Sequence, residues 1–268
     1  MQAAKVTVLT KPTTQASRPL STQERVELAW MRALFGTAYD SRERHALIDL
    51  ENDGAPARYW MTLVSSTTLP DGRVAVAVNG TPWNEGGIDL PGIATEGLLN
   101  VYLLRREGEG EEQTWIVDER HPNLASMGAM GRIGNVHWVS VGPGKPGFIV
   151  SSGIFNRGDS NTYARVYELG NGVRELADFT QSANNNDACT PERDKCWDIE
   201  GTIRFADAAA DGYADLLVGY SGKIYRQLDS AAEEPAEQVL RQIDETVHYR
   251  FDGKAYAIVA GTDPIAEL

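Results

Sequence analysis

Residues 205–220 read Phe205-Ala206-Asp207-Ala208-Ala209-Ala210-Asp211-Gly212-Tyr213-Ala214-Asp215-Leu216-Leu217-Val218-Gly219-Tyr220, and they join an acidic turn to an apolar run. Glycine directly after Asp favours a tight turn, because glycine adopts backbone conformations that other residues avoid. The apolar run that follows is typical of a buried strand. A weaker copy of this pattern spans residues 48–60, where carboxylates also surround an Asp-Gly pair. Both stretches predict hairpins of a β-rich fold.

Short runs of β-branched and aromatic residues alternate with Gly, Asn, Asp and Pro from about residue 46 onward. Turn signals between such runs predict hairpins. The clearest signals are at 70–72, 170–172 and 252–253, with a further hairpin around the acidic tip 107–112. About a dozen short strands at this spacing predict a mainly β, antiparallel fold. We expect either a β-sandwich or an incomplete β-propeller-like meander, with an N-terminal helix.

The N-terminal helix is predicted over residues 21–35. Ser21 and Glu24 form the pattern of a capping box, in which each residue satisfies a backbone N–H of the other. Residues 1–20 carry no periodicity and predict an extended tail, with one short run that could add an edge strand. The remaining residues, 21–268, predict a single β-rich domain.

A second helix is predicted from Pro235 to about Thr246, because Pro suits the first helical position and apolar residues recur at helical spacing. Ser221-Gly222 predicts a turn between two short strands. Long polar segments without a clear pattern predict loops, and loops of that length are often binding surfaces. These segments are residues 79–97, 119–135, 153–162 and 181–199.

The chain is acidic, with 25 Lys and Arg residues against 38 Asp and Glu residues and a formal net charge of -13 at pH 7. This charge repels phosphate backbones and anionic lipid, which argues against nucleic acid and membrane surfaces as partners. No apolar run approaches the roughly 20 residues that span a bilayer. A basic protein or a divalent cation is therefore the expected partner, while the oligomeric state stays open.

Cys189 and Cys196 lie close together in a polar loop. Their spacing permits a disulfide, which would place the protein in an oxidising compartment. Two free thiols and a metal site are the alternatives, but none of the four histidines lies in this loop. We expect the disulfide, and with it a periplasmic or secreted protein. The first residues lack the pattern of a secretory signal, as they would if an initiator Met had replaced one.

The two acidic turns resemble the Asp-rich loops of FG-GAP and VCBS-type repeats. In that family the pattern D-x-D-x-D-G-x-x-D precedes a Leu-Leu-Val strand, and its oxygens can bind calcium. The candidate ligands that match it are Asp207, Asp211 and Asp215 in the C-terminal copy and, more weakly, Asp49, Glu51 and Asp53 in the N-terminal copy.

Each copy lacks one carboxylate of the family pattern, because Ala209 and Ala57 stand at ligand positions. Calcium prefers six to eight oxygens, so a loop with one fewer side chain binds it weakly. Each acidic turn can therefore be either a β-turn without a metal ion or a calcium site. The copies are far apart, with no repeat between them, which departs from the regular spacing of a complete propeller.

The sequence contains no G-x-S-x-G, H-E-x-x-H, Walker or G-x-G-x-x-G motif, and no catalytic residue is assigned. Four residues are candidates for contact with a partner. His121 precedes a proline in an expected loop, Trp83 and Glu85 lie in another, and Trp197 follows the cysteine pair. Both tryptophans could stack on sugars, although bracing a loop is the commoner role of such side chains.

These observations predict a non-catalytic exported binding protein. Its most concrete version is a periplasmic inhibitor or immunity protein that neutralises a basic hydrolase or toxin, since acidic surfaces speed association with basic partners. A carbohydrate-active cell-wall hydrolase is one alternative, because paired carboxylates leave no sequence signature. A calcium-binding structural or adhesive module is the other.

Overall fold

A computed structural model of the chain describes residues 19–52, 55–83, 92–110, 113–208, 212–228 and 236–268. The described residues form one α-helix, short 3₁₀ turns and two antiparallel sheets. The elements in chain order are α1 (Thr22–Phe35), η1 (Gly36–Ala38), β1 (Tyr39–Asp40), β2 (His45–Asn52), β3 (Ala55–Thr68), β4 (Val74–Pro82), β5 (Gly97–Glu107), β6 (Thr114–Met127), β7 (Asn135–Gly142), β8 (Lys145–Asn156), β9 (Asp159–Gly170), β10 (Gly172–Asn184), η3 (Asn186–Ala188), β11 (Cys196–Ala208), β12 (Ala214–Leu228), β13 (Ala236–Phe251) and β14 (Tyr256–Ala260).

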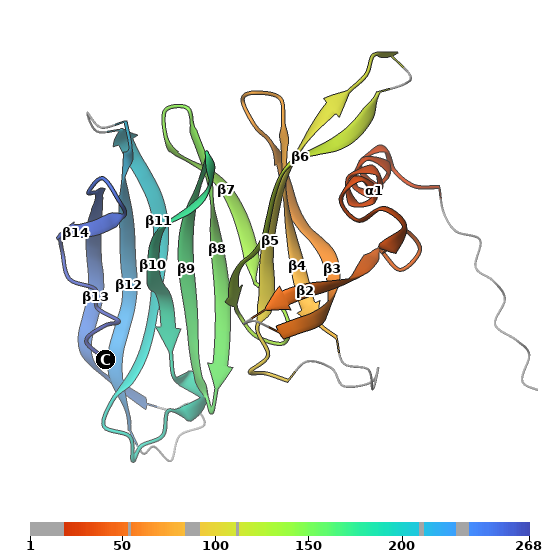
Figure 1. Ribbon diagram of the computed structural model, residues 1–268. Helices are drawn as coiled ribbons and strands as arrows, with labels where there is room; N and C mark the ends of the chain where they lie inside the picture. Colours follow the sequence, from red (N-terminus) through yellow and green to blue (C-terminus); the bar gives the residue numbers. More distant parts are fainter. Residues whose placement is uncertain (1–18, 53–54, 84–91, 111–112, 209–211, 229–235) are drawn as a thin grey trace, which may run out of the picture.

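Within each sheet, every strand pairs with its neighbours in sequence. The first sheet has six strands in the order β1-β2-β3-β4-β5-β6, and the second has eight in the order β14-β13-β12-β11-β10-β9-β8-β7. Figure 1 shows the sheets side by side, with α1 against the first. The expected fold class, a mainly β antiparallel meander with an N-terminal helix, is confirmed. No helix among the described residues is both long and apolar enough to cross a bilayer.

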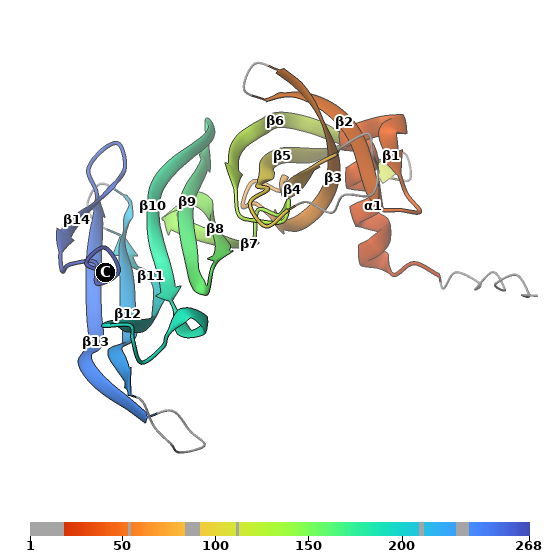
Figure 2. The same ribbon diagram turned by 90° about the horizontal axis from the view of Figure 1, so that it is seen from below.

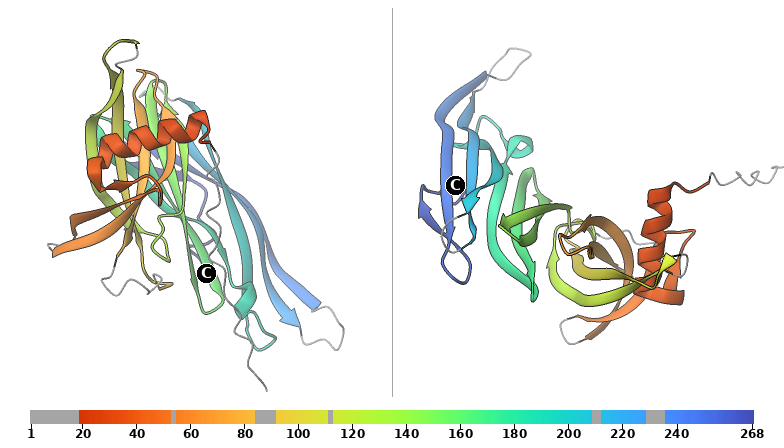
Figure 3. Two further views of the ribbon diagram at one scale, coloured as in Figure 1. Left: turned by 90° about the vertical axis from the view of Figure 1, so that its right-hand side faces the viewer. Right: turned by 90° about the horizontal axis from the view of Figure 1, so that it is seen from above.

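Helix α1 begins at the capping box that the sequence predicts. The Glu24 N–H donates to Ser21 Oγ (3.1 Å), and the Ser21 N–H donates to the Glu24 carboxylate (2.8 Å). Gly36 ends the helix with a φ of 56°, in the left-handed region that favours glycine. Trp30 and Leu34 are buried against the first sheet. The helix covers the face of this sheet that points away from the second sheet (Figure 3).

Strand β4, between β3 and β5 in the first sheet, is buried on both faces along most of its length. Val74, Val76 and Val78 pack toward α1, while Ala75 points to the core between the two sheets. Side chains alternate between faces along a strand, so this apolar run serves two cores at once. In the core between the sheets, Phe148 of β8 is fully buried beside residues of both sheets.

The second sheet curls around a core of its own, on the face away from the first sheet (Figure 2). The Tyr256 hydroxyl donates to the carbonyl of Ala214 (2.7 Å) and lies 3.5 Å from that of Val141. These contacts tie β14 and β12 to β7, at the other edge of the same sheet. The curl therefore brings the ends of distant strands together.

Two predicted elements near the C-terminus are wrong. Residues 235–246 were expected to be helical, but β13 runs from Ala236 and pairs with β12 along most of its length. Ser221-Gly222 was expected to be a turn, yet β12 continues through it. A Cβ on Gly222 would lie 2.0 Å from the Asp198 carbonyl oxygen, so glycine is needed here for close strand approach.

Several expected loops also belong to strands. Strand β6 continues to Met127, and β8 and β9 meet at a tight turn within residues 153–162. In the segment 181–199 only the part between β10 and β11 is a loop. The hairpins predicted at 70–72, 170–172 and 252–253 are confirmed. Most of the predicted tail lies outside the described residues.

Candidate functional site

A groove of about 700 Å³ opens where the two sheets separate beyond their shared core. One wall comes from β3 and β4 of the first sheet, from the segment before β5 and from the loop between β6 and β7. The other wall comes from the C-terminal end of β8 and the N-terminal end of β9. Its lining residues are Trp60, Thr81, Ile93, Ala129, Met130, Arg132, Gly134, Gly153, Ile154, Phe155 and Ser160.

Large apolar side chains are unusually exposed around this groove. Ile93 is 57% exposed, Met130 56%, Phe155 46% and Ile154 38%. Single exposed apolar residues are ordinary, but several gathered at one concave place indicate a binding surface. No sequence pattern predicts this site, because its residues come from distant parts of the chain.

The loop that carries Met130 is fixed by a buried amide. Asn79 is 5% exposed, and its Nδ2 donates to the Gly131 carbonyl oxygen (2.9 Å). Its Oδ1 accepts from the Ile133 N–H (3.0 Å). The Thr81 hydroxyl adds a second bond to Gly131 O (2.9 Å). Strand β4 thus holds the loop between β6 and β7 in one conformation.

Met130 is held in a strained backbone conformation, with a φ of 53°. A non-glycine residue in this region costs free energy, and such residues concentrate at functional sites. The neighbouring Gly131 has a φ of 71° and Gly134 a φ of 93°. A Cβ on Gly134 would lie 2.2 Å from the Ser151 carbonyl oxygen, so the loop passes very close to β8. The fold therefore keeps an exposed methionine in a strained backbone conformation.

The second wall is a strand end with one side open. The last pair between β7 and β8 is Asn135 with Ser151, yet β8 continues to Asn156. Across this extension β8 pairs only with β9, as in the pair Ile154 with Asn161. Among the described residues, no strand lies on the other side of β8 from Gly153 to Asn156.

Arg132 is the one ionisable side chain among the described residues that line the groove. It is exposed, and no carboxylate of the described part of the chain lies within ion-pair distance of it. A guanidinium keeps its positive charge at any physiological pH and offers several donors. The groove therefore combines apolar walls with one fixed cation.

The C-terminal acidic turn lies elsewhere, between β11 and β12. Asp215 is half-buried and contacts two side chains: its carboxylate lies 2.7 Å from His248 Nε2 and 3.1 Å from Arg250 Nη2. Arg250 and His248 hold the pKa of Asp215 below its usual range. Asp211 lies outside the described residues, and the structure describes no side chain at Asp207. Calcium at this turn stays a prediction.

The residues after this turn have a structural role. Tyr213 is buried, and its hydroxyl donates to the Glu168 carboxylate (3.0 Å). Its ring stacks on Phe251, with 3.8 Å between the centroids. Arg174 donates to both Glu168 and the Tyr213 hydroxyl, at 2.6 Å each. The turn is thereby anchored to three other strands of the sheet.

The N-terminal acidic copy forms the hairpin of β2 and β3. Asp49 pairs with Arg58 (2.7 Å), whose guanidinium holds the pKa of Asp49 below its usual range. Glu51 is exposed, and Asp53 lies outside the described residues. The described residues contain no group of three or more His, Cys, Asp or Glu placed to hold a metal ion.

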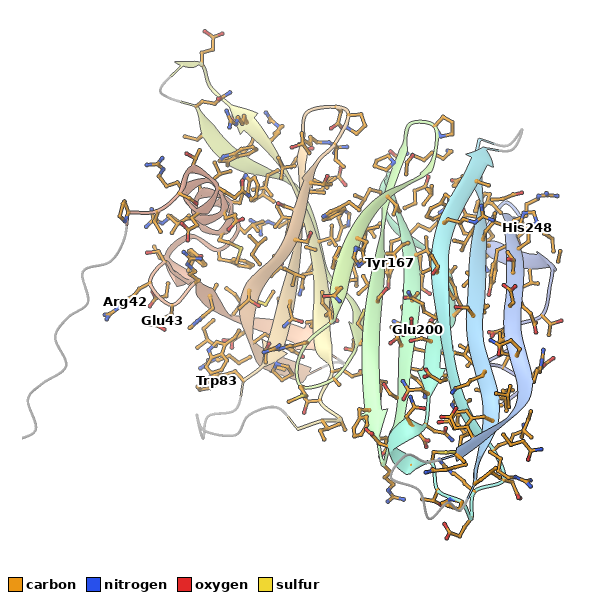
Figure 4. All side chains as sticks on the ribbon, turned by 180° about the vertical axis from the view of Figure 1, so that it is seen from behind. Arg42, Glu43, Trp83, Tyr167, Glu200 and His248 are labelled. Atoms are coloured by element: carbon orange, nitrogen blue, oxygen red, sulfur yellow. A yellow bond between two sulfur atoms is a disulfide. The ribbon has the colours of Figure 1, made fainter. Side chains whose placement is uncertain are left out.

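The four expected partner-binding residues are not brought together. Trp83 directly follows β4 of the first sheet and has Arg58 over its ring (5.3 Å). Figure 4 shows Trp83 beside the first sheet, away from Glu200 and His248 on the second. Trp197 lies in β11 of the second sheet, half-buried. His121 was expected in an exposed loop but lies within β6, where its Nε2 is 3.0 Å from Glu119 Oε2. Glu85 lies outside the described residues.

The predicted disulfide is present. Cys189 and Cys196 are joined, with 5.7 Å between their Cα atoms. Asn185 is fully buried beside them, and its Oδ1 accepts from the Trp197 N–H (2.8 Å). The bridge therefore braces the loop that leads from β10 to β11, and this loop does not line the groove.

No protein-family model matches the sequence, and no curated protein or solved structure matches it either.

Proposed function

We propose that this chain is a non-catalytic exported binding protein, which holds a protein partner at the groove between its two sheets. The observation that carries this proposal is the clustering of exposed Ile93, Met130, Ile154 and Phe155 around one concave site. Apolar anchors buried at the centre of an interface supply most of its binding energy. Strands and a hydrogen-bonded loop hold these anchors in place before the partner arrives.

The chemistry of the lining favours binding over catalysis. Arg132 is the sole ionisable group among the described lining residues, and an arginine guanidinium stays protonated at physiological pH. General acid–base catalysis needs a group with a pKa near the working pH. The same lining offers an apolar surface and a fixed positive charge, which suit recognition.

The most concrete version of the proposal is a periplasmic inhibitor or immunity protein that neutralises a basic hydrolase or toxin. The net charge of -13 supports a basic partner, because opposite net charges speed encounter. The disulfide between Cys189 and Cys196 is compatible with export. In this version the groove receives an apolar part of the hydrolase while the acidic surface draws it in.

Titration of purified basic cell-wall hydrolases with the protein tests this function. We expect stoichiometric loss of peptidoglycan cleavage for a matching hydrolase, with association that slows at high salt. Ile93→Thr should weaken the inhibition about tenfold or more, as removal of a central apolar anchor does. Val239→Thr is the matched control, since Val239 is similarly exposed (52%) but lies on β13.

Two outcomes would contradict the proposal. Equal effects of the two threonine variants would show that the groove is not the docking site. Turnover of peptidoglycan or model glycans by the protein alone would favour the carbohydrate-active alternative.

A further inference from the structure

The groove lies in line with strand β7. Gly134, which lines the groove, is the residue directly before β7, and Gly153, Ile154 and Phe155 of β8 line it on the same side. The first residue of β7, Asn135, pairs with Ser151, so the next residues of β8 lie where an extended β7 would have paired. The groove therefore occupies the position that an N-terminal extension of β7 would fill.

Within the described part of the chain, no backbone group pairs with β8 along the edge that faces this space. From Gly153 to Asn156 the strand pairs with β9 on one side only. Outside the ladder, the described residues provide no backbone hydrogen bond to this stretch. An open strand edge is a template for another strand, and proteins usually block it with charges or prolines. Here it carries Gly153, Ile154 and Phe155 instead.

We propose that the groove binds an extended segment of a protein partner, which adds to the second sheet as a strand against Gly153–Asn156 of β8. This mode of binding uses main-chain hydrogen bonds for affinity and side-chain pockets for specificity. The inference rests on the proposed function, because it specifies how the groove recognises its partner.

The lining specifies the sequence of that segment. A strand in this position presents alternate side chains to the opposite wall of the groove, which carries Trp60 of β3, Ile93 and Met130. Those alternate positions should be apolar. Arg132 lies on the same wall without a carboxylate partner among the described residues, so an Asp or Glu should stand beside the apolar positions.

Selection from a random peptide library displayed on phage provides the probe. The full protein is immobilised, and enriched peptides are synthesised for affinity measurements. We expect a shared pattern of alternating apolar residues with one acidic residue. Enrichment of basic peptides, or of peptides without alternation, would overturn the proposal.

A backbone N-methyl scan of the enriched peptide tests strand addition directly. Each N-methyl group removes one backbone donor and leaves the side chain unchanged. In a strand, alternate residues direct their N–H groups toward the neighbouring strand. We expect methylation to weaken binding about tenfold or more at every second position and little between, as the loss of a hydrogen bond would. A flat profile would overturn strand addition while leaving the groove as the binding site.

Variants of the protein locate the segment. Gly153 has nothing closer than 3.9 Å to an added Cβ, so Gly153→Val should fold and place methyl groups in the groove. Gly219→Val is the control, since Gly219 of β12 has open space around it. Arg132→Gln should weaken peptides that carry the acidic residue and leave their Asn or Gln analogues unchanged. Arg42→Gln is the control for that substitution, because Arg42 lies on the outer side of the first sheet (Figure 4).

The results separate the inference from the function on which it rests. Loss of hydrolase binding in Ile93→Thr together with a flat N-methyl scan overturns strand addition alone. Peptides that bind equally to the wild type and to Gly153→Val do not occupy the groove, and that result also overturns the inference.

Discussion

Asn79 of strand β4 donates a hydrogen bond from its buried Nδ2 to the carbonyl oxygen of Gly131, 2.9 Å away in the loop between the two sheets. Its Oδ1 accepts from the Ile133 N–H (3.0 Å) on the same loop. One side chain thus satisfies a buried donor and a buried acceptor of the segment that connects the sheets. The shape of the groove depends on this contact, because Arg132 lies between the two residues that it holds and Met130 directly precedes them.

Asn79→Ala should destabilise the protein by about 2 kcal/mol, because an unsatisfied buried polar group typically carries that cost. Urea denaturation at neutral pH measures the change. Asn171→Ala is the control, since Asn171 is exposed in the turn between β9 and β10. If both variants unfold at the same urea concentration as the wild type, the amide does not hold the loop.

Met130→Gly should make the protein more stable by about 1 kcal/mol, because glycine removes the strain of a left-handed backbone conformation. The φ of Met130 is 53°, and its side chain is mostly exposed, so little packing is lost. The same variant should bind the groove ligand more weakly. A substitution that raises the stability of the protein and lowers its affinity for the ligand indicates a residue that is retained for function.

Met130→Ala separates the two effects. It removes the same side chain from the groove but keeps a Cβ in the strained conformation. Its stability should stay within about 0.5 kcal/mol of the wild type, as for most surface substitutions. An equal gain in stability for the alanine variant would show that strain at this position is not the cause.

The hairpins and the first helix could be predicted because their signals are local. Ser21 with Glu24 forms the capping box, and Asp71-Gly72 forms a turn, without help from distant residues. The wrong prediction of a helix at 235–246 arises from contacts that are not local. Val239, Leu240 and Ile243 fit a helical face, but pairing with β12 overrides that local spacing. At Gly222 the chain needs close strand approach and not a turn, which only the neighbouring strand reveals.

The groove could not be predicted, because its walls meet only in the folded chain. Trp60, Met130 and Phe155 are far apart in sequence, and each alone reads as an ordinary apolar residue. One local signal was present: Gly128, Gly131 and Gly134 surround Met130, and all three have positive φ. A glycine-rich loop with a large apolar residue at its centre indicates a constrained backbone. The buried Asn79 that completes the loop carries no such signal.

The disulfide between Cys189 and Cys196 should contribute about 2 kcal/mol, since it closes a short loop. Replacing both cysteines with serine should lower stability by that amount and leave peptide binding at the groove unchanged. Non-reducing mass spectrometry of oxidised protein should find no free thiol. Two free thiols under those conditions would remove the main support for an exported protein.

Calcium has to compete with existing contacts at the C-terminal acidic turn, because Asp215 already pairs with Arg250 and contacts His248. We expect millimolar calcium to leave the melting temperature unchanged. The contrary result is specific: a melting temperature that rises with calcium as a binding isotherm, and a rise that Asp211→Asn removes, would establish a site.

The ion pairs of Asp215 should make stability depend on pH in the acid range. Arg250 and His248 lower the pKa of this carboxyl in the folded protein from its ordinary value of 3.8. The ionised form is therefore favoured by folding, so its contribution is complete above that ordinary pKa and is lost as the pH falls through the lowered pKa.

Asp215→Asn should cost about 1 kcal/mol at pH 7, in the range for a charge-assisted bond at a partly exposed site. The difference from the wild type should shrink as the pH falls below the ordinary value of 3.8, where the unfolded chain takes up the proton before the folded protein does. Asp244→Asn, at an exposed position on β13, serves as the control in the same urea titrations. A difference between wild type and Asp215→Asn that stays constant down to pH 2 would show that the substitution acts through packing and not through charge.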